Sequence, residues 1–123
     1  MKEVIAIIRP KKVEQTKNAL DELGFAGITA VPVLGRGHQR GIASEIGYGI
    51  STELLARNRS AGMKYIPKRM LSVVVRDSDV DTVVDTIVKI NQTANIGDGK
   101  IFVCPVDDAM RVRTDERGDP AII

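Results

Sequence analysis

Apolar and polar positions along the chain predict one order of elements used twice: strand, helix, strand. Residues 2–9 (KEVIAIIR) are β-branched and nearly continuous, as is typical of a strand buried on both faces. Residues 27–34 (GITAVPVL) predict a second strand, in which Pro32 requires an edge or a bulge. The same order returns later, with strands predicted at residues 69–76 (RMLSVVVR) and 100–106 (KIFVCPV).

A helix is predicted between the strands of each unit. Over residues 11–23, Val13, Leu20 and Leu23 recur at helical spacing, and Gly24 follows as a C-terminal cap. Over residues 80–90 the valines and isoleucines follow an i, i+3, i+4 pattern, with Ser78 as the expected N-cap.

This order of elements predicts an α+β fold of the ferredoxin-like, split βαβ type (βαββαβ), with both helices on one face of a four-stranded antiparallel sheet. At 123 residues the chain forms one domain, residues 1–123. Because the strands at 2–9 and 69–76 are apolar on both faces and two helices cover only one, we expect a homo-oligomer that buries the other face.

The amino-acid composition argues against several classes of function. The two Phe, two Tyr and absent Trp argue against nucleic-acid binding through stacked bases. The single Cys (Cys104) and single His argue against a disulfide framework, a zinc cluster and a nucleophilic triad, so we do not expect an enzyme. No apolar run suits a membrane span or a signal peptide, so we expect a cytoplasmic protein without membrane insertion.

The middle of the chain is basic and lacks a convincing strand. Residues 36–69 hold seven Lys or Arg against two Glu. This charge indicates either a solvated face or a surface for an anionic ligand or acidic partner. The stretch from Gly35 to Pro67 is long enough to indicate a flexible arm that docks on a partner, the alternative being a tolerated insertion. Without a second His, His38 fits a solvated side chain or a phosphate neighbour better than a metal ligand.

Two segments carry candidate anion-binding chemistry. Residues 93–100 (TANIGDGK) can form a nest of backbone N–H groups with Lys100 beside it, although Ala94 and Ile101 break the P-loop pattern and an ordinary Asp-Gly turn is the alternative. In residues 110–114 (MRVRT), Arg111 and Arg113 alternate along a predicted short strand, so both would face one triphosphate or carboxylate, or else solvent.

As an ordered set, six segments closely resemble the PII signal-transduction family (GlnB/GlnK-like). They are AIIRPKK at 6–12, GRGHQRG at 35–41, YIPK at 65–68, VDTVVDTI at 80–87, TANIGDGKIFV at 93–103 and RVRT at 111–114. The match spans nearly the whole chain, and only residues 42–64 depart strongly.

The resemblance implies a homotrimer that binds ATP or ADP in the clefts between subunits and senses 2-oxoglutarate, with a flexible recognition loop at about residues 36–67. Gln39 matches the residue that coordinates Mg²⁺ between ATP and 2-oxoglutarate. The implied 2-oxoglutarate-binding residues are Gln39, Arg40, Gly41 and Lys68. The implied nucleotide-binding residues are Thr29, Gly35, His38, Val74, Thr93, Gly97, Asp98, Gly99, Lys100, Arg111 and Arg113.

Some positions depart from the family pattern. His38 stands where the family usually has Arg, Ser72 where many members have a Glu near the adenine, and Ala94 where Gly is common. The recognition loop is longer than in ordinary members. Tyr48 lacks the usual surroundings of the modified tyrosine, so we do not expect uridylylation.

The longer loop with its GHQRG segment resembles the nitrogen-fixation-linked NifI branch. That resemblance implies a nitrogenase component protein as target, inhibited when nitrogen is plentiful and released by 2-oxoglutarate with ATP, and a second, paralogous NifI subunit as partner. The alternatives are a PII protein that regulates an ammonium transporter or glutamine synthetase and, less favoured, a small ferredoxin-like enzyme.

Overall fold

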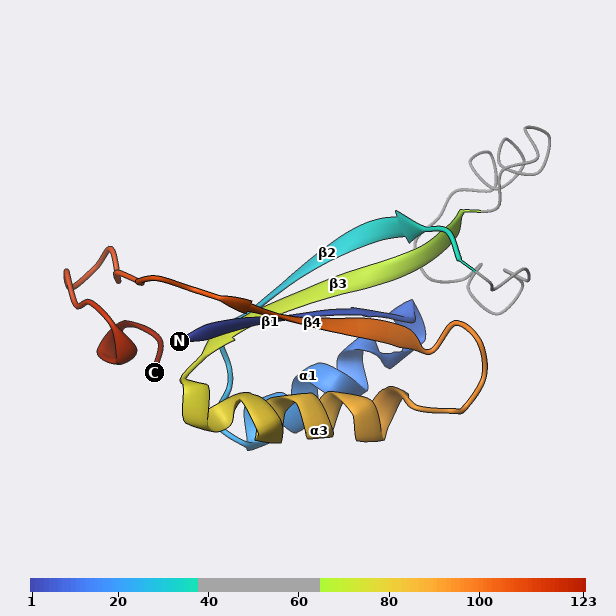
Figure 1. Cartoon of the computed structure of the whole chain (residues 1–123), viewed down its shortest axis with the longest axis horizontal. Helices are drawn as coiled ribbons and strands as arrows, with labels where there is room; N and C mark the ends of the chain where they lie inside the picture. The colour runs from blue at the N-terminus through green and yellow to red at the C-terminus, as the bar shows by residue number, and fades with distance from the viewer. Residues whose placement is uncertain (38–64) are drawn as a thin grey trace.

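The computed structural model of the chain describes residues 1–37 and 65–123 (Figure 1). Its strands are β1 (Lys2–Ile8), β2 (Ile28–Gly35), β3 (Ile66–Val75) and β4 (Gly99–Pro105), and its helices are α1 (Val13–Glu22) and α3 (Val80–Asn91). Short 3-10 turns are η1 (Pro10–Lys12), η3 (Asp77–Asp79) and η4 (Asp119–Ala121).

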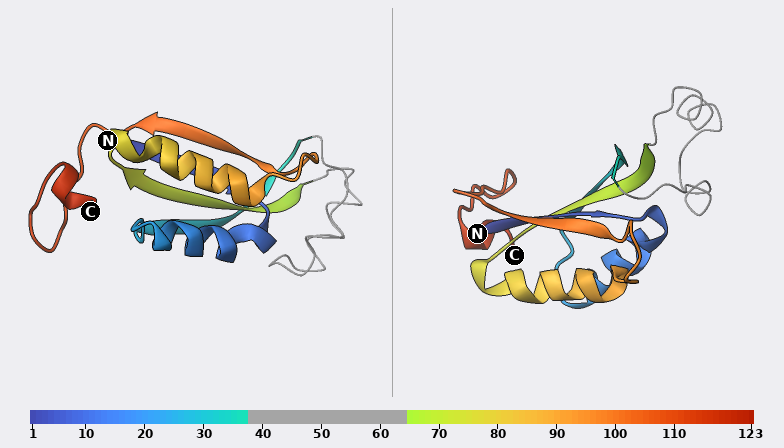
Figure 2. Two further views of the ribbon diagram at one scale, coloured as in Figure 1. Left: turned by 90° about the horizontal axis from the view of Figure 1, so that it is seen from below. Right: turned by 45° about the vertical axis from the view of Figure 1, so that its right-hand side comes forward.

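The strands form one antiparallel sheet in the order β2-β3-β1-β4, with both helices on the same face (Figure 2). The predicted ferredoxin-like fold is confirmed. β2 is an edge strand, which explains how it accommodates Pro32, a residue without a backbone N–H.

The core lies between the sheet and the helices. Every second residue of β1 from Val4, and of β3 from Leu71 to Val75, is buried toward α1 and α3, as a period of two requires. The buried members of this core are Val4, Ala6, Ile8, Leu20, Leu71, Val73, Val75, Val83 and Ile87.

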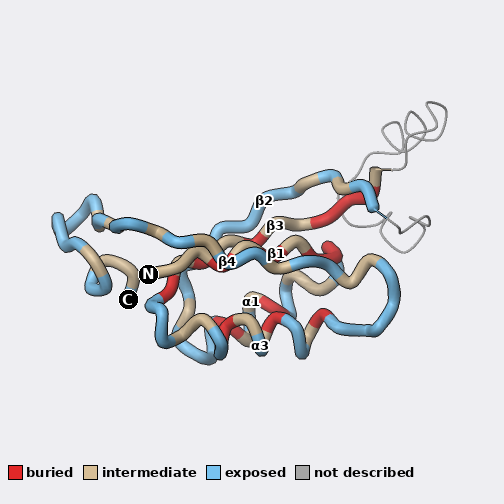
Figure 3. The backbone as a smooth tube through the Cα atoms, in the orientation of Figure 1, coloured by how far each residue is buried: buried red, intermediate tan, exposed pale blue. Residues whose placement is uncertain are grey.

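Within residues 1–37 and 65–123, no helix lies over the opposite face of the sheet (Figure 3). Val31 and Phe102 lie on this open face and are 39% and 46% exposed. Ile5 and Ile7 lie between them on β1 and are half-buried. The single chain therefore has the apolar surface that was predicted on the sheet face not covered by the helices.

Three local predictions need correction. Leu23 is 50% exposed, because α1 ends at Glu22 and Gly24, with φ +93°, turns the chain away as the predicted cap. Ser78 is not an N-cap, since it lies inside η3 and the helix begins after Asp79 without a side-chain cap. β3 begins at Ile66, three residues earlier than predicted, so Pro67 belongs to the sheet.

The segment around Arg111 is a turn. Val112–Thr114 form the turn, and Met110 makes an isolated bridge to Arg117. The N–H of Asp115, whose φ is +60°, donates to the main-chain oxygen of Arg111 and closes it. The predicted strand at MRVRT is therefore wrong, and strand alternation does not align Arg111 with Arg113. No helix within residues 1–37 or 65–123 has the length and apolarity to cross a membrane.

Candidate functional site

Asp98 organises the glycine-containing loop between α3 and β4 from within. Its carboxylate accepts hydrogen bonds from the backbone N–H groups of Thr93 (2.6 Å) and Ala94 (2.9 Å) and from the Thr93 hydroxyl. The guanidinium of Arg9 binds the same carboxylate at 2.6 Å. Thr93 and Asp98, both predicted nucleotide-binding residues, therefore bind each other in this structure.

These contacts make Asp98 a strongly held anion. Burial alone would raise the pKa of Asp98, but the hydrogen bonds from Thr93 and the charge and hydrogen bond of Arg9 outweigh it and hold the pKa far below its ordinary value. The backbone N–H groups of Thr93 and Ala94 are satisfied before any ligand arrives. A phosphate that binds this loop would therefore contact groups other than the backbone N–H groups of Thr93 and Ala94.

Arg9 was not predicted as part of the site. It is buried at the end of β1, and its second terminal nitrogen donates to the main-chain oxygen of Ile96 at 3.1 Å. Arg9 directly precedes Pro10, so it lies where β1 ends, beside the loop between α3 and β4. A buried arginine needs a carboxylate partner, but the chain offers sixteen acidic residues, and only the folded sheet identifies Asp98 as that partner.

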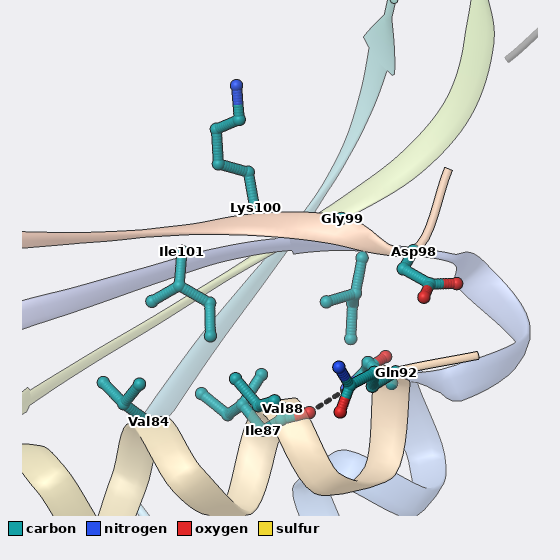
Figure 4. A pocket seen from close by; sticks show the side chains of 10 residues that line it. Val84, Ile87, Val88, Gln92, Asp98, Gly99, Lys100 and Ile101 are labelled. Atoms are coloured by element: carbon teal, nitrogen blue, oxygen red, sulfur yellow. Dashed lines mark hydrogen bonds between the residues drawn. The ribbon is translucent and has the colours of Figure 1, made fainter. Parts of the chain in front are cut away.

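Gly99 lets the loop close against the sheet. Its φ is +128°, and a Cβ at this position would lie 2.2 Å from the main-chain oxygen of Ile7. The next residue, Lys100, is exposed, and Figure 4 shows its side chain pointing to the open side of the sheet, away from Ile101, which points toward α3. Lys100 is thus directed to where an anion could reach it.

Lys68 joins β3 to the same loop. Its side chain is almost fully buried, and its ammonium group donates a 2.7 Å hydrogen bond to the main-chain oxygen of Gly97. Gly35 lies beside it, since a Cβ on Gly35 would meet the Lys68 side chain at 3.8 Å. Lys68, Gly35 and Gly97, three predicted site residues, are brought together.

A second group of predicted residues lies at the other end of the sheet. Thr29 and Val74 line a hollow of about 770 Å³ where β2 begins and β3 ends. Ser72, opposite Thr29 in the strand register, also lines it, as do Leu23, Phe25 and Ala121–Ile123. Thr29 and Val74, two of the predicted nucleotide-binding residues, therefore share a hollow that the chain's last residues help to form, whereas Gly35 lies at the far end of β2.

Arg111 lies next to these last residues and is already engaged. Its guanidinium binds Glu116 at 2.6 Å and donates to the main-chain oxygens of Pro120 (3.1 Å) and Ile123 (2.7 Å). Arg113 is exposed within the adjoining turn. Arg111 thus holds residues 116–123 in place, a role not predicted from the sequence.

The predicted phosphate-binding residues lie at opposite ends of β4. Gly97, Gly99 and Lys100 are at its start, whereas Arg111 and Arg113 lie beyond its end (Figure 1). Seven extended residues span roughly 20 Å, which is longer than a triphosphate. One chain does not gather these residues around one ligand.

The remaining predicted residues lie outside the described part of the chain. They are His38, Gln39, Arg40, Gly41 and Tyr48. Across residues 1–37 and 65–123, no group of three or more His, Cys, Asp or Glu side chains is placed to hold a metal ion. The predicted Mg²⁺ ligand Gln39 remains a prediction.

Comparisons with known proteins agree with this architecture. Residues 1–116 match the family described as nitrogen regulatory protein P-II. The chain belongs to the P-II family. It is 57% identical over 122 residues to the nitrogen fixation nifHD1 region GlnB-like protein 2 of Methanosarcina barkeri, covering 99% of both chains.

A second relative and a solved structure are also similar to this P-II chain. The nitrogen fixation nifHD region GlnB-like protein 2 of Methanobacterium ivanovii is 54% identical over 123 residues, the full length of both chains. A crystal structure of Arabidopsis thaliana PII bound to citrate has a TM-score of 0.73 at 34% identity, and covers 98% of this chain and 88% of that chain. The names of the Methanosarcina barkeri and Methanobacterium ivanovii relatives confirm the predicted resemblance to the nitrogen-fixation-linked branch.

Proposed function

We propose that the chain is a nitrogen-regulatory P-II signalling protein that binds ATP or ADP and 2-oxoglutarate and controls nitrogenase. The family match supports the regulatory role, and the names of the methanogen relatives support the link to nitrogen fixation. The observation that carries the binding proposal is the clustering of Lys68, Gly35 and Gly97 at one end of the sheet.

The nucleotide lies between subunits in this proposal. Lys100 and Arg113 sit at opposite ends of β4, so a second copy must supply one of them to complete a triphosphate site. The apolar open face around Ile5, Val31 and Phe102 gives copies a surface to pack on. Size-exclusion chromatography with light scattering should give a homotrimer, and a monomer would contradict it.

The effector is a dicarboxylate that binds at Lys68. The ammonium group of Lys68 suits a carboxylate, and citrate, bound in the Arabidopsis structure, is a multi-carboxylate. Gln39 would complete the site by coordinating Mg²⁺ between the effector and the ATP phosphates, since Mg²⁺ prefers oxygen ligands.

Calorimetric titration tests this function directly. 2-Oxoglutarate is titrated into the protein with Mg²⁺, with and without ATP. Heat of binding only in the presence of ATP is the expected result. Absence of binding in both conditions would leave a P-II scaffold with a different effector.

The proposed target is a nitrogenase component protein, and the proposed co-subunit is a paralogue. The relatives are named protein 2 of a nifHD region, which suits a numbered pair of GlnB-like proteins. Pull-down with nitrogenase component, ammonium transporter and glutamine synthetase, each with and without 2-oxoglutarate, separates this target from the two alternatives. Capture of nitrogenase that 2-oxoglutarate and ATP reverse is the expected outcome.

A further inference from the structure

A separate hollow of about 330 Å³ lies between α3 and β4, on the helix side of the sheet. Figure 4 shows Ile101 of β4 pointing toward Val84 and Val88 of α3, and all three side chains line the hollow. The side chain of Lys100 leaves β4 in the opposite direction. This α3–β4 hollow therefore lies on the other side of β4 from the open face to which Lys100 points.

Asn91, the last residue of α3, also lines the α3–β4 hollow, and the direction of its amide group is fixed. Its Nδ2 donates to the hydroxyl oxygen of Thr16 at 3.0 Å and to the main-chain oxygen of Ile87 at 2.8 Å. The Thr16 hydroxyl gives its own hydrogen to the main-chain oxygen of Lys12 at 2.7 Å. Because neither partner of Asn91 can donate to it, the amide nitrogen must face both of them.

The oxygen of the same amide group has no partner. Asn91 is 5% exposed, and within residues 1–37 and 65–123 its Oδ1 is the one buried side-chain nitrogen or oxygen without a hydrogen bond. A buried acceptor without a donor destabilises a protein, and native structures rarely retain one. Since Asn91 lines the α3–β4 hollow, a molecule bound there can supply the missing donor.

We propose that the α3–β4 hollow binds a neutral, mainly apolar small molecule whose single N–H or O–H group donates to Oδ1 of Asn91. An apolar cavity of about 150 Å³ holds benzene, so a hollow of this size suits a molecule of roughly ten non-hydrogen atoms. The aliphatic lining favours an apolar body. The carboxylate of Asp98, which also borders the hollow, is already bound to Arg9, so a cationic ligand is not favoured.

Indole and benzofuran form a matched pair of probes for this site. They share size and fused-ring shape, but indole has an N–H donor where benzofuran has an ether oxygen. Each is titrated into the full-length protein, with and without ATP and Mg²⁺, and followed by NMR of the valine and isoleucine methyl groups. We expect saturable shifts at Val84, Val88 and Ile101, and binding of indole at least fivefold tighter than that of benzofuran.

Three variants accompany the titrations. Asn91→Leu removes the acceptor and should bring the two affinities within twofold of each other. Asn18→Leu is the matched control, because it makes the same change at an exposed position of α1, and it should leave the preference for indole unchanged. Val88→Phe enlarges a partly exposed side chain of the lining and should weaken both probes at least fivefold.

The thermal unfolding midpoint of each variant identifies any that fail to fold. If Asn91→Leu is one of them, the ratio of the two affinities in the unsubstituted protein carries the test. Equal affinities there, no binding of either probe, or shifts confined to Val74 in the hollow where β2 begins would overturn the inference. An unchanged preference in folded Asn91→Leu would do the same. Binding of ATP enters none of these outcomes, so failure of this inference and failure of the proposed function are distinguishable.

Discussion

Lys68 and Gly97 are joined by a hydrogen bond of 2.7 Å from the lysine ammonium group to the glycine main-chain oxygen. The bond connects β3 to the loop before β4. A carboxylate bound by Lys68 would share with the Gly97 oxygen an ammonium group that has three N–H donors. Effector binding and the shape of the glycine-containing loop are therefore expected to be coupled.

Replacing Lys68 should separate the effector from the nucleotide. Lys68→Met retains the buried aliphatic stem and removes the charge. We expect 2-oxoglutarate affinity to fall at least tenfold, because the carboxylate loses its charged partner, and ATP affinity to change less than threefold. Calorimetry with ATP and Mg²⁺ present measures both affinities. Normal 2-oxoglutarate binding by Lys68→Met would show that the effector lies elsewhere.

Asp98 should stabilise the fold in a pH-dependent way. Its pKa in the folded protein is held below its ordinary value of about 3.9, so its contribution is fully present above about pH 5 and is lost as the pH falls through the folded pKa. At pH 7, Asp98→Asn should lower the free energy of unfolding by about 2–4 kcal/mol, because it removes the carboxylate that binds the buried Arg9 guanidinium.

Denaturant unfolding at pH 7 and at low pH checks this prediction. The difference between Asp98→Asn and the unsubstituted protein should shrink as the pH is lowered from about 5 toward 2. Asp85→Asn, an exposed position on α3, is the matched control and should change stability by less than about 0.5 kcal/mol. A deficit of equal size at every pH would mean that the Asp98 charge is not what stabilises the loop.

The helices and strands could be predicted from the sequence because the apolar pattern of each one lies within its own residues. The nearly continuous apolar run of β1 and the i, i+3, i+4 pattern of α3 identify the two elements without any long-range information. The edge position of β2 was likewise signalled by Pro32. The helix starts were harder, since η3 is a short turn that shifts the beginning of α3 past Ser78.

Contacts between distant residues could not be predicted in the same way. Arg9 and Asp98 are 89 positions apart, and Ser72 and Glu3 are 69 apart. Nothing in the local sequence selects one carboxylate over another as partner. The MRVRT segment failed as a strand because Glu116 and the residues after it fold back on Arg111, a contact that strand alternation does not encode.

Ala94 adopts a backbone conformation that favours glycine. Its φ is +67°, in the left-handed region, where a Cβ costs roughly 1–2 kcal/mol. Ala94→Gly should therefore raise the free energy of unfolding by about 0.5–1 kcal/mol, after the greater entropy of glycine in the unfolded chain is deducted. Urea denaturation measures it, with Ala109→Gly, outside helix and strand, as a comparison. A stability loss on Ala94→Gly would contradict the assigned strain.

The two arginines after β4 should have different roles. Arg111→Ala removes the contacts to Glu116, Pro120 and Ile123, so proteolysis and amide exchange within residues 116–123 should accelerate. Arg113→Ala should leave these rates unchanged and greatly weaken ATP binding. Equal exchange rates in the two variants would mean that Arg111 does not hold this segment.

The intersubunit site predicts complementation between two inactive variants. Lys100→Ala and Arg113→Ala should each remove ATP binding from every cleft of a trimer without unfolding it. When the two are co-refolded in equal amounts, about one quarter of the clefts should combine an intact Lys100 from one subunit with an intact Arg113 from its neighbour. Calorimetry on the mixture should then recover about one quarter of the binding sites. If both residues served a ligand within one chain, mixing would restore none, because each chain would still lack one of them.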